Sequence, residues 1–212
     1  ETNSKHVSKF EIRNSKLPRR CLVGLGGGKD SIVSAELLKG AGIGFDAFIV
    51  ETGKHSPLTD KVASVMGKNL FKIQRIMDSK IHEKHLYSGH IPISAVYAFL
   101  GIFACVVYKY SHIIVSNEHS SNFGNINYKG LEINHQWSKS FEFESLFQDY
   151  VKNIISPEVT YFSLLRPFYE IRIVKMFVKY KQYFPHFSSC NRNFTRKGNE
   201  GKLWCGQCPK CV

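Results

Sequence analysis

Three consecutive glycines followed by Lys, Asp and Ser form the segment of this chain with the most specific chemical implication. The segment comprises Gly26, Gly27, Gly28, Lys29, Asp30 and Ser31. It follows the apolar run 21–25 and precedes the helical pattern 32–39, so it is predicted to be a strand-to-helix turn. Glycine lets the backbone approach an anion closely, and the first turn of a helix offers unpaired N–H groups with partial positive charge. The sequence therefore predicts a binding site for an oligophosphate.

The spacing of this segment excludes the two most familiar phosphate loops. A dinucleotide fingerprint requires a glycine where Lys29 stands, and a Walker loop requires Gly at Val23 and Ser or Thr at Asp30. The segment instead resembles the pyrophosphate loop of the ATP pyrophosphatase superfamily, S-G-G-x-D-S, with Gly26 replacing the first serine. The resemblance implies that ATP binds here, with the N–H groups of residues 27–31 on its pyrophosphate and Asp30 helping to place Mg²⁺. A purely structural glycine turn is the alternative.

Four cysteines near the end of the chain have the spacing of a metal site. They are Cys190, Cys205, Cys208 and Cys211. Four thiolates can close on one tetrahedral zinc ion and leave no open position for catalysis, so a structural Zn²⁺ site is predicted. An iron–sulfur cluster and a site without metal are the alternatives. The remaining Cys21 and Cys105 fall in runs predicted to be core, and no export signal is visible, which argues against disulfides.

The chain is basic, with 29 Lys and Arg against 17 Asp and Glu and a formal net charge of +12. Such a balance favours an anionic partner, and nucleotides are one class of anionic ligand. The basic residues are scattered without a block of like charges, so no dedicated nucleic-acid arm is predicted. No apolar run is long enough to span a bilayer and no signal peptide is visible, so the expected location is the cytoplasm, without a membrane partner.

Apolar strand-like runs alternate with helical patterns along the chain. The predicted strands cover residues 21–25, 45–50, 71–76 and 112–116. The predicted helices cover residues 32–39, 58–68, 93–110, 138–155 and 169–181. This alternation predicts an α/β fold, an open, mostly parallel sheet with helices on both faces, followed by a small four-cysteine knuckle. Such sheets bind ligands at the carboxyl ends of their strands, so the loops after Leu25, Val50 and Ser116 are expected to face one crevice.

These elements divide the 212 residues into three predicted parts. Residues 1–18 are interpreted as the end of a preceding segment or a linker. Residues 19–185 are interpreted as the ATP-binding catalytic domain, and residues 186–212 as the zinc knuckle. Because the chain lacks an initial Met and stops one residue after its last cysteine, it is interpreted as part of a longer protein with a truncated knuckle.

The loops expected at the crevice carry further candidate ligands. Glu51, Thr52 and Gly53 end the second predicted strand, and relatives in the superfamily carry a similar acidic-Thr-Gly near the adenosine. Arg166, before Pro167, resembles a superfamily arginine near the phosphates, and a guanidinium suits an oligophosphate. The resemblance thus implies nucleotide contacts for these residues, with a plain turn and a surface arginine as the respective alternatives.

Residues 116–144, the polar segment hereafter, combine His, Lys, amide and carboxylate side chains with Trp137 and Phe141. The segment follows a predicted strand and therefore lies at the expected crevice. A solvated loop seldom combines so many polar groups with aromatic side chains. This composition is typical of a pocket for a polar ligand.

Seven sequence blocks, spread from the glycine turn to the last cysteines, form a recognisable set. They are residues 27–31, 89–92, 116–120, 134–140, 161–167, 189–192 and 204–211. Together they resemble the bacterial ATP-dependent UDP-N-acetylmuramoyl-L-alanyl-L-glutamate epimerase family, whose members invert the terminal L-Glu of a peptidoglycan precursor. The resemblance implies a UDP-linked muramoyl dipeptide as substrate. It also implies activation of the glutamyl carboxylate by ATP, with release of AMP and diphosphate.

Inversion of an α-carbon requires a base on one face and an acid on the other. Converting the carboxylate to an acyl-adenylate removes its charge, which makes the neighbouring proton easier to abstract. The candidates for the two roles, which the sequence does not rank, are Glu118, His119, Glu132, His135, Lys139 and Glu142.

Two other enzyme classes and one non-enzymatic function are the alternatives. 7-Cyano-7-deazaguanine synthase has a similar loop and a late four-cysteine site, but it favours a shorter gap than the fourteen residues between Cys190 and Cys205. A tRNA-modifying enzyme with a pyrophosphate loop would account for the basic charge. A nucleotide-binding regulatory module would leave the polar segment without a purpose. The block 134–140 favours the epimerase over both other enzymes.

Overall fold

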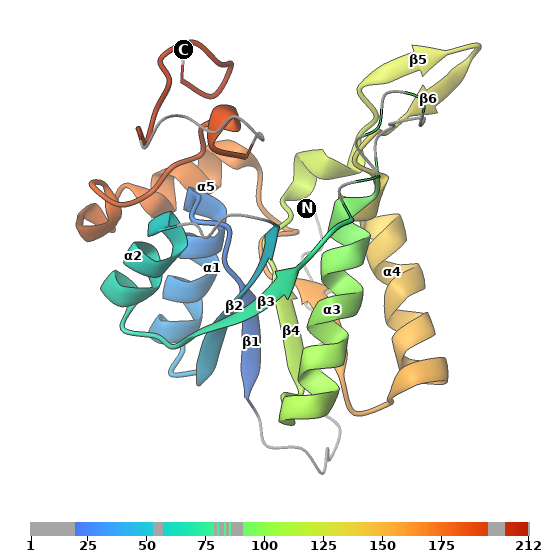
Figure 1. The fold of residues 1–212 in the computed structure, drawn as a ribbon, viewed down its shortest axis with the longest axis horizontal. Coiled ribbons are helices and arrows are strands. Elements are labelled where there is room, and N and C mark those ends of the chain that lie inside the picture. The colour runs from blue at the N-terminus through green and yellow to red at the C-terminus, as the bar shows by residue number, and fades with distance from the viewer. Residues whose placement is uncertain are drawn as a thin grey trace, which may run out of the picture.

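The fold is built on one parallel sheet (Figure 1). The computed structural model describes residues 20–52, 57–78, 80, 83, 85, 91–194 and 202–211. The strands of the sheet are β1 (Cys21–Gly24), β2 (Phe45–Thr52), β3 (Leu70–Arg75), β4 (His112–Val115) and β7 (Thr160–Ser163). They pair in the order β3-β2-β1-β4-β7, and every pair is parallel. The predicted fold class is therefore confirmed.

Strand β1 lies at the centre of the sheet because it is apolar on both sides. Leu22 and Val23 point to opposite faces, belong to the two separate core clusters and are 0% and 1% exposed. From β1 the chain builds β2 and β3 on one side and then β4 and β7 on the other. The strand order thus reverses between β1 and β4, and an open sheet binds ligands at such a switch point.

Helices cover both faces of the sheet, as the alternation of patterns predicted. One face carries α1 (Lys29–Gly40), α2 (Pro57–Met66) and α5 (Glu170–Phe177), and the other carries α3 (Ile93–Tyr108) and α4 (Phe141–Tyr150). Each group of helices buries its apolar side in its own core cluster against the sheet. Among the described helices, none has the length and apolar character needed to cross a membrane.

Two cysteines lie inside these cores and behave as small apolar side chains. Cys21 and Cys105 are buried, and no disulfide links the cysteines of the described residues. Burial raises the pKa of the Cys21 thiol to about 11 and that of the Cys105 thiol to about 12. Both thiols therefore stay protonated at neutral pH, as the prediction of core positions requires.

Three strands, one in the sheet and two in a hairpin, were not predicted from the sequence. Strand β7 has four residues and is defined by its pairing with β4. Strands β5 (Ile126–Tyr128) and β6 (Leu131–Ile133) form a hairpin that projects from the body of the protein (Figure 1). Its turn residues Lys129 and Gly130 have φ of 51° and 78°, and positive values at both positions match the twist of a two-residue hairpin.

The helix predicted over 138–155 is shorter and interrupted. Residues Trp137–Lys139 form a 3₁₀ turn (η3), and α4 begins after Ser140, whose hydroxyl accepts the N–H of Phe143 at 3.2 Å. After Tyr150 the chain widens into a π turn, Val151–Ile155 (η4). A serine cap therefore decides where this helix starts, and a single periodic pattern did not reveal it.

Candidate functional site

The predicted pyrophosphate loop, residues 26–31, joins the carboxyl end of β1 to the first turn of α1. Gly28 is the N-cap residue, with φ −93° and ψ 171°, and no described side chain caps the helix. The Ser31 hydroxyl instead donates to the Gly28 carbonyl at 3.0 Å. The first N–H groups of α1 therefore have no side-chain acceptor, and such groups favour a bound anion.

Gly27 is the glycine of this loop that no other residue can replace without strain. Its φ is +80°, and a Cβ built there would lie 2.9 Å from Cδ2 of Leu58 in α2. Its carbonyl accepts the N–H of Ser188 at 3.0 Å. A Cβ at Gly26, by contrast, would meet nothing within 4 Å. The loop is thus shaped by a left-handed residue packed between α2 and the segment before Cys190.

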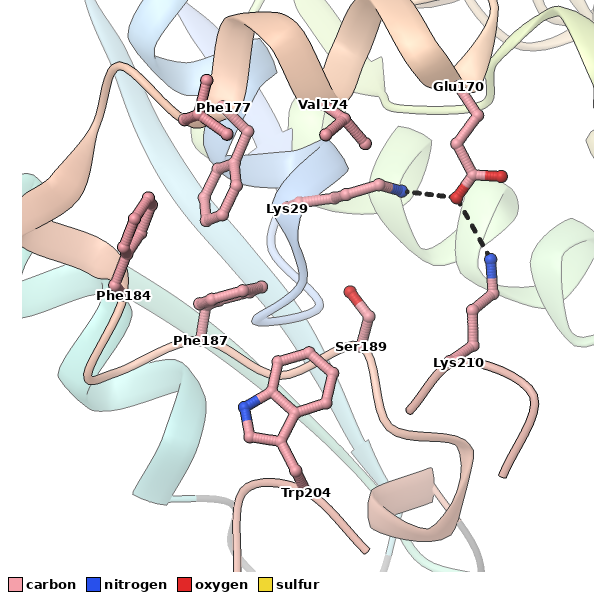
Figure 2. A pocket seen from close by; sticks show the side chains of 10 residues that line it. Lys29, Glu170, Val174, Phe177, Phe184, Phe187, Ser189, Trp204 and Lys210 are labelled. Atoms are coloured by element: carbon pink, nitrogen blue, oxygen red, sulfur yellow. Dashed lines mark hydrogen bonds and ion pairs between the residues drawn. The ribbon is translucent and has the colours of Figure 1, made fainter. Parts of the chain in front are cut away.

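A chain of ion pairs runs from the loop to the cysteine knuckle (Figure 2). Nζ of Lys29 lies 2.9 Å from Oδ1 of Asp30 and 3.0 Å from Oε1 of Glu170, and the same Oε1 lies 3.3 Å from Nζ of Lys210. Burial opposes the charge of Lys29, but Asp30 and Glu170 outweigh it and raise the lysine pKa. The hydrogen bond from Lys29 lowers the pKa of Glu170. Lys29 and Glu170 are therefore both charged at neutral pH.

The candidates at the end of β2 lie at the same edge of the sheet as the loop. Glu51 and Thr52 are the last two residues of this strand, which is paired with β1. The Leu25 N–H donates to the Phe48 carbonyl at 2.8 Å, so β2 continues beyond the point where β1 ends. Gly53 lies outside the described residues. A contact of Glu51 and Thr52 with adenosine stays a prediction.

Arg166 is the centre of a buried network that organises the polar segment. Its guanidinium donates to Oε2 of Glu144 from Nη2 at 2.8 Å and from Nε at 3.2 Å. It also donates to the carbonyls of Glu118 and Lys139 at 3.2 and 2.8 Å, and to the side chains of Ser121 and Asn122 at 2.9 and 3.2 Å. In this arrangement the guanidinium is used by protein acceptors, and its predicted contact with phosphate stays a prediction.

Glu118 and His119 begin the polar segment after β4, at the 3₁₀ turn η2 (His119–Asn122). The Glu118 carboxylate caps this turn and accepts from the N–H of Ser120 at 2.7 Å. The His119 ring packs against Tyr169 and Phe123, with centroids 4.4 and 5.6 Å away. The His119 ring is thus held by aromatic side chains, whereas the Glu118 carboxylate is used to cap the turn that follows it.

Three other candidates have partners near the hairpin or on α4. The Glu132 carboxylate accepts the N–H of Gly124, and Nδ1 of His135 lies 2.6 Å from Oδ1 of Asn125. Oε2 of Glu142 accepts the indole N–H of Trp137 at 2.6 Å. All three carboxylate or imidazole side chains belong to exposed residues. Their observed hydrogen bonds shape the polar segment, and their catalytic roles stay predictions.

Lys139 is the candidate of the polar segment whose ammonium group interacts electrostatically with the pyrophosphate loop. Burial lowers the pKa of its ammonium group, while Asp30 acts in the opposite direction and Lys210 adds to the lowering. These interactions bring together groups from three places: η3, the loop and the cysteine knuckle. A half-buried lysine with a lowered pKa is the kind of group that can act as a general base near neutral pH.

The four cysteines converge, as the spacing predicted. Their Sγ atoms all lie within 4.8 Å of one another, and Cys190 is fully buried. Individual Sγ–Sγ distances are 3.9 Å for Cys190–Cys208, 3.8 Å for Cys205–Cys211 and 3.4 Å for Cys208–Cys211. A tetrahedral ion with metal–sulfur bonds of about 2.3 Å would place its sulfurs about 3.8 Å apart. The donor set thus fits a single metal ion.

The cysteine knuckle packs directly on the pyrophosphate loop and lies above α1 and α5 in Figure 1. The N–H of Ser188 donates to Gly27, and the Ser188 hydroxyl both donates to the Leu203 carbonyl at 2.5 Å and accepts the Cys190 N–H at 3.1 Å. Ser188, which contacts the loop, therefore lies two positions before Cys190, the first metal-ligand candidate.

The residues that the sequence reasoning missed are Glu144, Glu170 and Lys210. Glu144 had a usable signal, because it lies with Phe143 and Phe147 on the buried side of α4, and a carboxylate on an apolar face needs a partner. Glu170 and Lys210 had no such signal. They are distant in sequence from Lys29 and from each other, and only the fold brings them together.

The fold and the loop define an α/β protein of the pyrophosphate-loop type. Among solved structures, the chain is similar to the U34-tRNA thiolase NcsA from Methanococcus maripaludis with its 4Fe-4S cluster. The TM-score is 0.50 at 11% sequence identity, over 79% of this chain and 58% of that chain. At this identity the likeness concerns the fold alone.

Residues 1–164 match the model of the family described as MurL N-terminal domain, and the chain belongs to this family. It is 39% identical to the UDP-N-acetyl-alpha-D-muramoyl-L-alanyl-L-glutamate epimerase of Xanthomonas oryzae pv. oryzae (strain MAFF 311018). The 194 aligned residues cover 90% of this chain and 42% of the relative. It is 34% identical over 204 residues to the protein of the same name from Micromonospora sp. (strain ATCC 39149 / NRRL 15099 / SCC 1413), over 95% of this chain and 44% of the relative. The chain thus spans less than half the length of these curated relatives. The predicted family is confirmed.

Proposed function

We propose that the full-length protein is an ATP-dependent epimerase of peptidoglycan precursor synthesis. It adenylates the α-carboxylate of the terminal L-Glu in UDP-N-acetylmuramoyl-L-alanyl-L-glutamate and inverts the α-carbon to the D configuration. The observation that supports this most is the electrostatic interaction of Lys139, a half-buried lysine with a lowered pKa, with Asp30 of the pyrophosphate loop. This interaction links a side chain that can transfer a proton with a loop that is suited to bind ATP. ATP and nucleotide-linked substrates are cytoplasmic molecules, so the proposed location is the cytoplasm.

In the adenylation step, a glutamyl carboxylate oxygen attacks the α-phosphorus of ATP and diphosphate leaves. The uncapped N–H groups at the start of α1 and the Ser31 hydroxyl are suited to hold the leaving diphosphate. Lys29 adds a positive charge at the same place. Asp30 carries the carboxylate that would help to bind Mg²⁺, which neutralises phosphate charge when bound. Glu51, Thr52 and Gly53 remain the proposed neighbours of the adenosine.

In the inversion step, one group removes the α-proton of the acyl-adenylate and another returns a proton to the opposite face. Lys139 is proposed as one of the two groups, because burial lowers its pKa and it lies near the loop. His119 is proposed as the second, since aromatic side chains hold its ring at the start of the same segment. Water then hydrolyses the adenylate to release the carboxylate and AMP.

Arg166 is proposed to position both groups, in addition to the contact with phosphate that the resemblance implies. Its guanidinium binds the carbonyl of Lys139 and the carbonyl of Glu118, which precedes His119. Glu118, Glu132, His135 and Glu142 are then proposed to shape the pocket that receives the muramoyl dipeptide. Their carboxylates and imidazole already serve turns and the hairpin.

Zinc is the metal proposed for Cys190, Cys205, Cys208 and Cys211. The short Sγ–Sγ distances support one ion shared by four thiolates. In a cubane iron–sulfur cluster each thiolate binds a different iron, so the thiolates surround a larger object. With four protein ligands the ion is structural. Its proposed role is to hold residues 188–190 against Gly27, which also makes the knuckle, residues 186–212, depend on the domain 19–185.

The decisive experiment incubates the full-length protein with ATP, Mg²⁺ and the UDP-linked muramoyl dipeptide in D₂O. The expected result is AMP, diphosphate and the D-Glu epimer, with deuterium at the glutamyl α-carbon. Solvent exchange is the informative readout, because a ligase or a thiolase also makes AMP but has no reason to break that C–H bond. AMP formation only with a deazaguanine acid and ammonia, or only with tRNA, would overturn the proposal.

A further inference from the structure

A cavity of about 370 Å³ lies beside the pyrophosphate loop, between α5 and the cysteine knuckle (Figure 2). Its lining residues are Lys29, Glu170, Val174, Phe177, Val178, Phe184, Phe187, Ser189, Trp204 and Lys210. None of these described lining residues comes from β1, from β2 or from the polar segment. The cavity therefore lies beside the crevice at the carboxyl ends of the strands, and it shares Lys29 with the loop.

Aromatic side chains form one side of this cavity. Phe187 packs against Phe177 and Trp204, with ring centroids 4.5 and 5.2 Å apart, and Phe177 also packs against Phe184 at 5.5 Å. Trp204 nevertheless keeps 36% of its surface exposed, and Phe184 keeps 41%. Rings that support one another and still present free surface are suited to stack on a planar ring of a ligand.

Two ammonium groups form the other side. Nζ of Lys29 and Nζ of Lys210 both contact Oε1 of Glu170, at 3.0 and 3.3 Å (Figure 2). One carboxylate oxygen between two lysines marks a position that suits the oxygen of a phosphate equally well. The hydroxyl of Ser189 lines the cavity between this ionic side and the aromatic side.

We propose that this cavity binds the uridine diphosphate part of the substrate, with uracil against Trp204 and Phe187 and the diphosphate on Lys29 and Lys210. The cavity lining indicates a ligand with a planar base and phosphates. The assignment of that base as uracil rests on the proposed function. The reaction needs two nucleotides bound together, ATP in the loop and the UDP part of the substrate here, so Lys29, which lines the cavity, would lie between the phosphates of both. Lys139 interacts electrostatically with Lys210 of the cavity lining, so the muramoyl dipeptide is expected to continue from here toward the polar segment.

Glu170 competes with the diphosphate in this arrangement. When the diphosphate binds, it takes over the two ammonium groups and Glu170 must turn away. The proposal therefore makes an unusual prediction, that removing the negative charge at Glu170 strengthens binding of UDP. It makes no such prediction for uridine, which lacks the phosphates.

The test is calorimetric titration of the full-length protein with UDP, ADP, uridine and pyrophosphate, without other substrates. Trp204→Ala is expected to weaken UDP about tenfold, as loss of a stacking ring typically does, while Trp204→Phe retains most of the affinity. Phe103→Ala is the matched control, because it removes an exposed ring from α3 on the opposite face of the sheet. Glu170→Gln should tighten UDP severalfold and leave uridine unchanged.

Because Trp204 precedes Cys205, metal content is measured for each variant. Val174→Trp provides an independent variant, since it fills the cavity from α5, away from the cysteines, and it should abolish UDP binding. The proposal is overturned if UDP does not bind, if Val174→Trp leaves UDP affinity unchanged, or if Trp204→Ala weakens ADP as much as UDP. The last result would make this the adenine site.

Failure of this inference is distinguishable from failure of the proposed function. If solvent deuterium enters the glutamyl α-carbon but the cavity variants leave UDP affinity unchanged, the proposed epimerase activity is supported and the proposed UDP site is wrong. If UDP binds as expected but no epimerisation occurs, the site stands and the reaction is wrong.

Discussion

The pyrophosphate loop and the polar segment lie at the same edge of the sheet, but different interactions hold them in place. The loop is held by its backbone, through the positive φ of Gly27 and the hydrogen bond from Ser188. The polar segment is held by side chains that converge on Arg166 and Glu144. The comparison teaches that the loop is a local structure supported from outside, whereas the polar segment depends on one buried ion pair.

Removal of the metal should have the largest effect and should act on the loop. A structural four-thiolate zinc site contributes on the order of 10 kcal/mol to the folding of small zinc domains. A purified, colourless protein with about one zinc per chain is expected. Chelation should then speed hydrogen exchange of the amides of residues 27–31 far more than that of residues 117–122. Equal acceleration in both regions would contradict the separate support of the two, and a brown protein would indicate iron–sulfur.

Breaking the ion pair should act on the polar segment. The side chains of Arg166 and Glu144 are 12% and 5% exposed, and removing one partner of a buried pair typically costs about 3–5 kcal/mol. Glu144→Gln should therefore lower the free energy of unfolding by several kcal/mol, about 3 or more, in urea denaturation. Asp149→Asn, at an exposed position of the same helix, is the control and should change it by less than about 0.5 kcal/mol. Similar values for both variants would show that the pair is not the support.

Alanine substitutions at two neighbouring glycines test whether the backbone conformation at Gly27 is what the loop requires. Gly27→Ala forces a Cβ at φ +80° to within 2.9 Å of Leu58, and a strained position of this kind costs about 1–3 kcal/mol. AMP formation should fall by about tenfold or more. Gly26→Ala, where a Cβ would meet nothing within 4 Å, should change AMP formation less than about twofold. A larger loss at Gly26 than at Gly27 would mean that the loop changes shape when ATP binds.

Two side chains of the loop test its proposed chemistry without changing its shape. Asp30→Asn removes the proposed Mg²⁺ ligand, and Ser31→Ala removes a hydroxyl that donates to the Gly28 carbonyl. Each is expected to abolish formation of AMP and diphosphate while the melting temperature changes little. Full turnover by either variant would exclude the loop from the mechanism.

The smallest expected effect on stability concerns Lys139, and the direction of its pH dependence can be derived. Burial lowers the pKa of this lysine in the folded protein, so the unfolded chain binds the proton more tightly. Its contribution to stability is therefore unfavourable at neutral pH and improves as the pH rises through the lowered pKa toward the ordinary lysine value. Lys139→Met should slightly stabilise the protein at pH 7 and should stop α-carbon exchange while AMP still forms. Unchanged exchange in this variant would exclude Lys139 as a catalytic residue.

Much of the fold could be predicted because its signals are local. Three glycines before a helical pattern, apolar runs such as 45–50, and the C-x₂-C-x₂-C run each depend on neighbours in the chain. Parallel sheets are buried on both faces, so their strands are continuous apolar runs that the sequence displays directly. The α/β class, the strands β1 to β4, the helices on both faces and the convergence of the cysteines were all predicted from such signals.

Long-range contacts could not be predicted in the same way. Strand β7 exists because β4 pairs with it, and Arg166 became the centre of a buried network because Glu144 lies on the inner side of α4. The ion pairs of Glu170 join it to Lys29, 141 positions earlier in the chain, and to Lys210, 40 positions later. These charges interact strongly only at distances of a few ångströms. The packing of α5 and the knuckle on the loop sets those distances. The sequence by itself determined which chemical groups are present, and the tertiary structure decided which of them meet.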